Sequence, residues 1–170
     1  MARTSLQDVR SLPDPLQQYN WDIMIPIMPG SPNSRDMTIK AMTTSIPGSM
    51  LEKVEVPLHG VQVNYAGRAN FTHSLQVTFL ETRDNGTRDK LRTWQRIARD
   101  WLTNTGTYKD VYSTTVEMIL YDDIPTETKR IKLIGCFVES VDDASVDGGA
   151  SAAVQISCTL SYDYLEEETL

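Results

Sequence analysis

The chain has 170 residues, 40% of them apolar and 23% charged, values that exclude a collagen-like or wholly disordered chain. At roughly 100 to 200 residues per domain, the length predicts a single domain, residues 1–170, and excludes a small disulfide-stapled scaffold. Residues 1–132 hold all 16 Lys and Arg and 15 of the 23 acids, so the net charge of −7 comes from residues 133–170. This balance disfavours a broad nucleic-acid-binding footprint, and solubility is its simplest explanation.

The two ends of the chain carry charge rather than long apolar runs. Met1–Leu12 lacks the apolar region of a signal peptide, so secretion by that route is not expected. The longest apolar stretch, Ile23–Pro29, contains two prolines and is far shorter than the roughly 20 residues that span a bilayer, so no membrane anchor is expected. We expect residues 1–18 to form an N-terminal arm and residues 165–170 an acidic C-terminal tail.

The sequence predicts a mainly β chain, an antiparallel barrel or sandwich with one amphipathic helix. Runs of β-branched and aromatic residues recur between turn signals such as His59-Gly60 and Asp147-Gly148-Gly149. The predicted strands are Tyr19–Ile27, Met37–Thr44, Leu51–Val56, Val61–Tyr65, Phe71–Thr82, Tyr112–Tyr121, Arg130–Val138 and Ala152–Tyr164. The last of these alternates most cleanly, so one of its faces should pack inward.

One segment, Thr87–Asn104, has helical periodicity instead. Thr87 is expected to be its N-cap, and the Asn that ends the segment is followed by a Gly that should stop the helix. The residues expected to pack inward are Leu91, Trp94, Ile97 and Trp101. The opposite side should present a basic ridge of Arg88, Arg92, Arg96 and Arg99. This ridge is either a solvated helix face or a docking surface.

Catalytic and metal-binding signatures are missing from the sequence. His59 and His73 belong to no metal-site spacing, and no phosphate-binding loop or nucleophile elbow occurs. Cys136 and Cys158 are expected to be two buried thiols, with a single cross-strand disulfide as the alternative. The sequence therefore predicts a protein that is not an enzyme and needs no cofactor or metal.

The order of these features resembles a known family. Asp14-Pro15 precedes Tyr19-Asn20-Trp21-Asp22-Ile23, and a strand then leads into Ser45-Ile46-Pro47-Gly48. Next come Leu51 to Tyr65, Ala66-Gly67, the Thr72 to Leu80 strand, the Trp94 helix, and Ser161-Tyr162-Asp163-Tyr164. Over residues 14 to 164 this order is similar to that of the tail tube proteins of contractile-tailed bacteriophages. That family shares its fold with the inner tubes of secretion systems and tailocins.

The resemblance implies a structural subunit of the virion tail. Six subunits would form a ring with a continuous inner β-barrel, and rings would stack into a hollow tube through which DNA passes without specific binding. The implied partners are further copies of the chain, a contractile sheath, and baseplate and tail-terminator proteins. Assembly would take place in the host cytoplasm.

Polar and charged residues can be assigned to surfaces of such a tube. A DNA conduit should repel phosphate, so polar strand residues are candidates for the lumen: Gln62, Asn64, Glu117, Gln155 and Asp163. The arginine ridge would face the sheath. Contacts between rings could pair basic residues near loops with an acidic loop, namely Arg35, Lys53 and Arg68 with Glu139, Asp142, Asp143 and Asp147.

Three other functions compete with a phage tail tube. The inner tube of a type VI secretion system or tailocin would have the same fold. A monomeric β-barrel that binds a small ligand would use the apolar faces as a pocket. An enzyme would require a site assembled from residues that are distant in the sequence.

Overall fold

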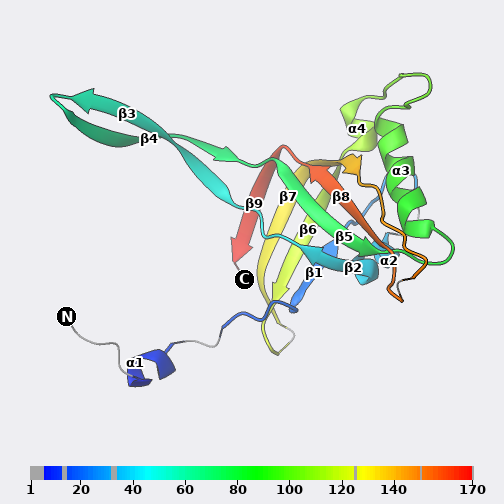
Figure 1. Cartoon of the computed structure of the whole chain (residues 1–170), viewed down its shortest axis with the longest axis horizontal. Coiled ribbons are helices and arrows are strands. Elements are labelled where there is room, and N and C mark those ends of the chain that lie inside the picture. The colour runs from blue at the N-terminus through cyan, green and yellow to red at the C-terminus, as the bar shows by residue number, and fades with distance from the viewer. Residues whose placement is uncertain (1–5, 13–14, 32–33, 125, 150, 170) are drawn as a thin grey trace.

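The computed structural model describes residues 6–12, 15–31, 34–124, 126–149 and 151–169. Its body is a curled antiparallel sheet, from which one long hairpin projects (Figure 1). The strands of the sheet are β1 (Trp21–Met24), β2 (Ala41–Thr44), β5 (Ser74–Leu80), β6 (Thr114–Tyr121), β7 (Glu127–Val141), β8 (Gln155–Ser161) and β9 (Tyr164–Thr169). They follow the order β1-β6-β7-β8-β5-β2, and β9 pairs with β7. The mainly β fold with antiparallel sheets and a few helices confirms this part of the sequence prediction.

The core lies on the concave side of the sheet. Alternate residues of the central strands point inward, so that Val116 and Met118 of β6 meet Ile131 and Leu133 of β7 in the buried cluster. The alternation predicted for the last long strand is also present, because Ile156, Cys158 and Leu160 of β8 are all buried. Period-2 patterning therefore directs side chains to the core in these strands.

The longest helix, α3 (Gly86–Ala98), packs against β7 and β8. Leu91 and Trp94 are completely buried, and Ile97 lies against the turn at Gly30. The prediction that the helix continues to Asn104 is wrong, because Arg99 is extended and forms a β-bridge with Gly106. Trp101 consequently lies beyond the helix and is 52% exposed, so its predicted inward packing is wrong as well.

The N-terminus of α3 is capped by a residue outside the helix. Asn85, in a left-handed conformation, occupies the N-cap position, and the Thr87 hydroxyl bonds to the Leu80 carbonyl, so the assignment of Thr87 as N-cap is wrong. The Glu81 carboxylate, at the end of β5, accepts hydrogen bonds from the backbone amides of Thr87 (3.1 Å) and Arg88 (3.0 Å). Because the first turn of a helix has free amides, this carboxylate fastens α3 to the sheet.

Acidification should weaken this attachment. Burial raises the pKa of Glu81, but hydrogen bonds from the amides of Thr82, Arg88 and Thr87 together outweigh burial, so the net pKa lies below its ordinary 4.5. A lowered pKa stabilises the fold above the unfolded value of 4.5, and this stabilisation is lost as the pH falls through the folded-state pKa. We expect Glu81→Gln to cost about 1 kcal/mol near neutral pH and less on acidification. Thermal melts of both proteins between about pH 7 and pH 3 should converge at the acidic end; a constant difference would contradict this role.

Three short helices were not predicted. They are α1 (Leu6–Arg10), α2 (Arg35–Lys40) and α4 (Lys109–Tyr112). The predicted strand Met37–Thr44 is wrong in its first half, because α2 buries Met37 and only β2 is extended. A single helical turn has too few apolar positions to reveal a period, and tertiary contact of Met37 decides its conformation.

The expected acidic tail is instead a strand. Residues 165–169 belong to β9, which pairs with β7, so the prediction of a separate tail is wrong there; residue 170 lies outside the described residues. Lys129 binds Glu167 at 2.6 Å and Lys132 binds Glu168 at 3.3 Å. The arm predicted for residues 1–18 contains α1, while residues 1–5 and 13–14 lie outside the described part.

Both cysteines are free and buried, as the favoured alternative predicted. Burial raises the pKa of Cys136 and of Cys158 to about 12. Both thiols are therefore protonated at neutral pH and behave as small apolar side chains.

Candidate assembly interface

A two-stranded hairpin, β3 (Ser49–Leu58) and β4 (Val61–Phe71), forms a sheet of its own and extends away from the body (Figure 1). His59 and Gly60 both have positive φ angles, 47° and 82°, as a two-residue hairpin turn requires. A bulge between Leu51 and Lys53 shifts the register. Nearly every residue of the hairpin is exposed. An isolated two-stranded hairpin is at best marginally stable in water, so we expect this one to gain stability from contact with another surface.

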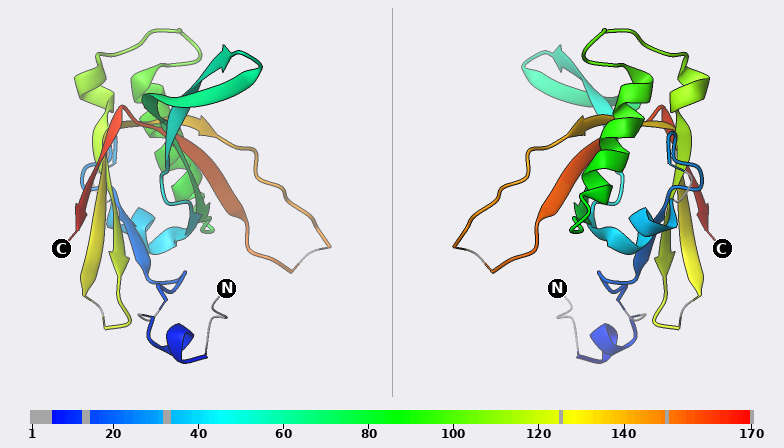
Figure 2. Two further views of the ribbon diagram at one scale, coloured as in Figure 1. Left: turned by 90° about the vertical axis from the view of Figure 1, so that its left-hand side faces the viewer. Right: turned by 90° about the vertical axis from the view of Figure 1, so that its right-hand side faces the viewer.

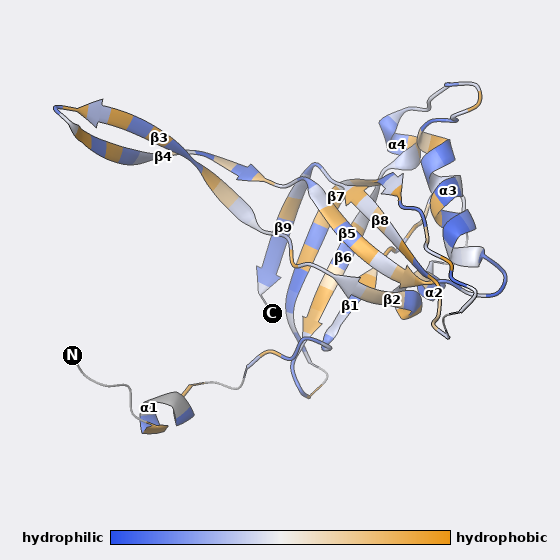
Figure 3. Ribbon diagram, in the orientation of Figure 1, coloured by the Kyte–Doolittle hydropathy of each residue, from blue (hydrophilic) through white to orange (hydrophobic). Residues whose placement is uncertain are grey.

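The outer half of the hairpin has one apolar and one polar face. Cross-strand partners point to the same side, and the pairs Val54–Tyr65, Val56–Val63 and Leu58–Val61 share one face. Alternating bands of hydropathy along both strands show this pattern (Figure 3). The six side chains form what we call the apolar hairpin face: Val54, Val56, Leu58, Val61, Val63 and Tyr65. This contiguous apolar surface is characteristic of an interface between proteins.

The opposite face of the hairpin contains two of the predicted lumen residues. Gln62 donates a hydrogen bond to Asn64 (3.2 Å), and Glu55, the partner of Asn64, forms an ion pair with Lys53. Lys53 was predicted to contact a neighbouring ring. The polar face of the hairpin therefore carries both predicted lumen residues and a predicted inter-ring residue. The polar face carries balanced charge.

The other three predicted lumen residues lie in the body, on different elements. Glu117 is on β6, half-buried, 3.5 Å from Arg130. Gln155 is exposed at the start of β8. Asp163 lies in the turn between β8 and β9, where its carboxylate contacts Lys109 at 2.5 Å and covers Gly135. The five predicted lumen residues therefore lie on several separate elements of the described structure.

The four arginines of the predicted basic ridge contact different parts of the structure. Arg92 and Arg96 lie over the ring of Trp101, with 5.9 Å and 5.0 Å between guanidinium carbon and ring centroid. Arg99 bonds to the side chain of Asn104 at 3.0 Å. Arg88, at the N-terminal end, borders a cavity of about 910 Å³ beneath the connection from β7 to β8.

That connection carries most of the predicted acidic loop. It bows away from the body in both views of Figure 2. Asp143 borders the same cavity as Arg88, and Gln95 of α3 donates to the Glu139 carbonyl at 3.0 Å. The predicted basic partners lie elsewhere: Arg35 begins α2, whereas Lys53 and Arg68 are on the hairpin.

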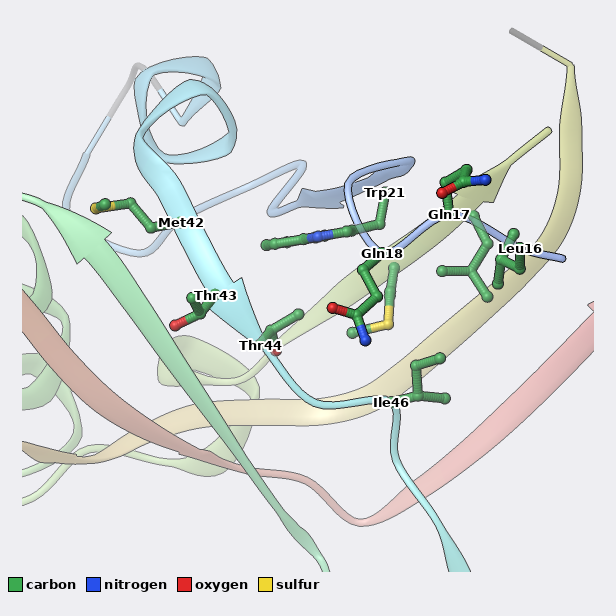
Figure 4. A pocket seen from close by; sticks show the side chains of 10 residues that line it. Leu16, Gln17, Gln18, Trp21, Met42, Thr43, Thr44 and Ile46 are labelled. Carbon is green, nitrogen blue, oxygen red and sulfur yellow. The ribbon is translucent and has the colours of Figure 1, made fainter. Parts of the chain in front are cut away.

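A cavity of about 420 Å³ separates the edge strands β1 and β2 (Figure 4). Trp21 and Thr44 border it from the two strands, and residues 16–18 close one side. Its lining is apolar or uncharged: Leu16, Gln17, Gln18, Trp21, Met42, Thr43, Thr44, Ile46, Met118 and Leu120. The convergent charged groups typical of a ligand or catalytic site do not border this cavity.

Within the described ranges, acidic, His and Cys side chains do not gather into a group that could hold a metal ion. The helices of that part are all too short or too polar to span a membrane.

The fold formed by the curled sheet, the helix packed against it and the exposed hairpin is similar to that of chains in solved structures of contractile injection systems. A baseplate structure of the anti-feeding prophage matches with a TM-score of 0.70 at 14% identity, covering 93% of this chain and 98% of the other. A sheath-tube complex of the PVC extracellular contractile injection system matches with a TM-score of 0.60 at 14% identity, covering 99% and 100%. At these identities the structures establish the fold.

The chain is also similar in sequence to tail tube proteins of bacteriophages. The chain is 26% identical over 151 residues to the tail tube protein of Serratia phage KSP90, covering 86% of this chain and 85% of the relative. It is 27% identical over 135 residues to the tail tube protein gp19 of Enterobacteria phage T4, covering 78% and 82%. A search of protein-family models found no match. The recognition of a contractile-phage tail tube protein is confirmed, and such proteins are structural rather than enzymatic.

The apolar hairpin face was not predicted. Its signal was present, because apolar residues alternate in both segments that flank His59-Gly60. Alternation alone does not distinguish a face that packs on its own core from one that packs on another molecule. The three-dimensional position of the hairpin, outside the body, makes that distinction.

Proposed function

We propose that this chain is the subunit of a phage tail tube, in which hexameric rings stack into a hollow channel that conducts DNA. The observation that carries the proposal is the hairpin with one apolar face that its own subunit leaves exposed. Similarity to two phage tail tube proteins over more than three quarters of the chain supports it. The tube is a component of the virion tail, assembled in the host cytoplasm.

Two different surfaces of the subunit would contact each other when copies assemble. The apolar hairpin face of one copy covers the body of the next, a heterologous contact that generates rings or filaments rather than closed dimers. The sheet also has free edges, because β1, β2 and β9 each pair on one side only within the described residues. Unpaired edges in a ring are available for hydrogen bonding to neighbouring copies.

The geometry of a closed barrel supports passage of DNA. With four strands from each of six subunits, strands about 4.8 Å apart and tilted about 45° give a backbone radius of roughly 26 Å. A duplex fits within this radius after side chains are added. Uncharged Gln62 and Asn64 on the polar hairpin face suit a wall that must not retain phosphate.

The proposal is tested by the mass of the purified 19.1 kDa chain in solution. Sedimentation should detect a species six times the mass of the chain, and larger species as rings stack. A stable monomer over a wide concentration range would contradict the proposal and favour the ligand-binding barrel. The phage assignment is preferred to a secretion-system or tailocin tube because the curated relatives are phage tail tube proteins.

The basic ridge of α3 is proposed to face the sheath. Charge reversal at two exposed positions, Arg92→Glu and Arg96→Glu, should leave tubes intact and weaken sheath binding, most strongly at low salt where screening is least. Sheath co-sedimentation across a salt series measures this effect. Equal binding by the variant and the native tube at every salt concentration would show that the ridge is only solvated.

Rings are proposed to stack through contacts between basic residues of the hairpin and an acidic loop. Lys53 and Arg68 are on the hairpin, and the acidic loop with Asp142, Asp143 and Asp147 lies at the other side of the body (Figure 1). Each exposed ion pair contributes only about 0.2 to 1 kcal/mol to stacking, but the same pair would occur six times around a ring. The ends of the tube would bind baseplate and tail-terminator proteins.

A further inference from the structure

The segment between α3 and α4 holds an exposed tryptophan in a defined position. Trp101 is 52% exposed, although Trp is among the residues that are usually well buried. Leu102 and Tyr108 of the same segment are 79% and 86% exposed. The region therefore displays large apolar side chains on the outside of the subunit.

The backbone around Trp101 is fixed by hydrogen bonds. The Asp100 amide donates to the Thr105 carbonyl (2.9 Å), and the Leu102 amide donates to the Asp100 carboxylate (3.0 Å). Thr107 closes the segment on α3, its hydroxyl donating to the Ile97 carbonyl (2.5 Å). Because the loop is already ordered, a partner that binds Trp101 does not bear the full entropy cost of ordering it.

Two arginines complete the patch. Arg92 and Arg96 stack on the Trp101 ring, at 5.9 Å and 5.0 Å, and the amino groups of a stacked guanidinium remain able to bind carboxylates. Arg96 also approaches Asp100, at 3.6 Å, which holds its side chain toward the loop. The exposed guanidinium groups of this patch would be complementary in charge to an acidic partner.

A groove lies beside Trp101. It has a volume of about 620 Å³, and its apolar border consists of Ala98, Trp101, Phe137 and Val138. An apolar side chain of a partner could therefore enter the groove while neighbouring carboxylates meet the arginines. Trp and Arg are the residue types most enriched among those that dominate binding energy at interfaces.

We infer that Trp101, Arg92 and Arg96 form the anchor for an acidic segment of the sheath protein, one that places an apolar side chain in the adjacent groove. This inference rests on the proposed function, since it requires a tube that a sheath surrounds. It goes beyond the charged ridge, because it assigns the main contact to a neutral aromatic side chain. Charge complementarity with the stacked arginines selects the acidic partner.

The experiment compares three tubes in co-sedimentation with purified sheath protein from the same phage. Trp101→Ala should weaken sheath binding about tenfold or more while tubes form normally. Trp101→Phe keeps an aromatic ring, so its sheath affinity should lie between those of the native and Trp101→Ala tubes. Ile124→Ala removes a comparably exposed apolar side chain at the β6–β7 turn and serves as the matched control, which should bind as the native tube does.

Tryptophan fluorescence of assembled tubes provides a second measurement. Acrylamide should quench the fluorescence of Trp101, taken as the difference between native tubes and Trp101→Phe tubes, and sheath binding should protect it. A single-stranded DNA oligonucleotide in place of the sheath should give no protection.

Three outcomes would overturn the inference: sheath binding by Trp101→Ala equal to that of the control, loss of tubes by a folded Trp101→Ala subunit, or protection of Trp101 by DNA alone. The second outcome would assign the patch to contacts between subunits. Failure of the native chain to form tubes would instead overturn the proposed function, so the two failures are distinguishable.

Discussion

Trp94→Ala should destabilise the subunit by about 3 to 5 kcal/mol. The Trp94 ring is completely buried between α3 and the sheet, and removing it leaves a cavity that the surrounding strands cannot fill. Its indole also donates to the Tyr112 carbonyl at 2.6 Å, which ties α4 to α3. For a chain of this length the melting temperature should fall on the order of 10 °C.

Trp101→Ala is the matched control for this substitution. The same residue type is removed, but from an exposed loop, so the melting temperature should change little. Thermal denaturation followed by circular dichroism measures both variants. Equal melting temperatures for the two would contradict the different roles that the structure assigns to them.

Val63→Asp should abolish tube formation without unfolding the subunit. Val63 lies in the middle of the apolar hairpin face, opposite Val56, and a carboxylate there would be buried without a partner in the assembled tube. The hairpin lies outside the body and pairs only with itself, so the core should be unaffected. We expect a monomer with a native circular dichroism spectrum in place of rings.

Asn64→Asp adds the same charge to the adjacent residue, on the polar face. Because that face is proposed to line the lumen, tubes of this variant should form. Electron microscopy of the two variants separates the effect of position from the effect of charge. Normal tubes from Val63→Asp, or loss of tubes from both variants, would contradict the assignment of the faces.

The sequence predicted the parts of the fold that repeat a pattern over many residues. Alternation identified the core strand β8, and helical spacing identified α3 together with the burial of Leu91 and Trp94. The prediction failed for Trp101 because its spacing continues the helical period, although the chain leaves the helix at Arg99. There the Asp100 amide donates to the carbonyl of Thr105 instead of continuing the helical pattern, a contact that requires the loop to fold back.

The assembly surfaces were harder to predict. Asp163 was predicted to face the lumen because it is polar, and the fold places it beside Lys109, which is distant in the sequence. The acidic C-terminal residues were predicted to form a tail, whereas three basic residues of β7 lie opposite them: Lys129, Arg130 and Lys132. Net charge along the sequence does not reveal which acidic and basic residues contact one another in the fold.

Assembly through the apolar hairpin face is tested most directly by a cryo-electron microscopy reconstruction of the assemblies that the purified chain forms. We expect six subunits in each ring, a hollow channel, and the side chains of Val56 and Val63 in contact with a neighbouring copy. A monomer, or a ring in which the apolar hairpin face remains exposed to solvent, would contradict it.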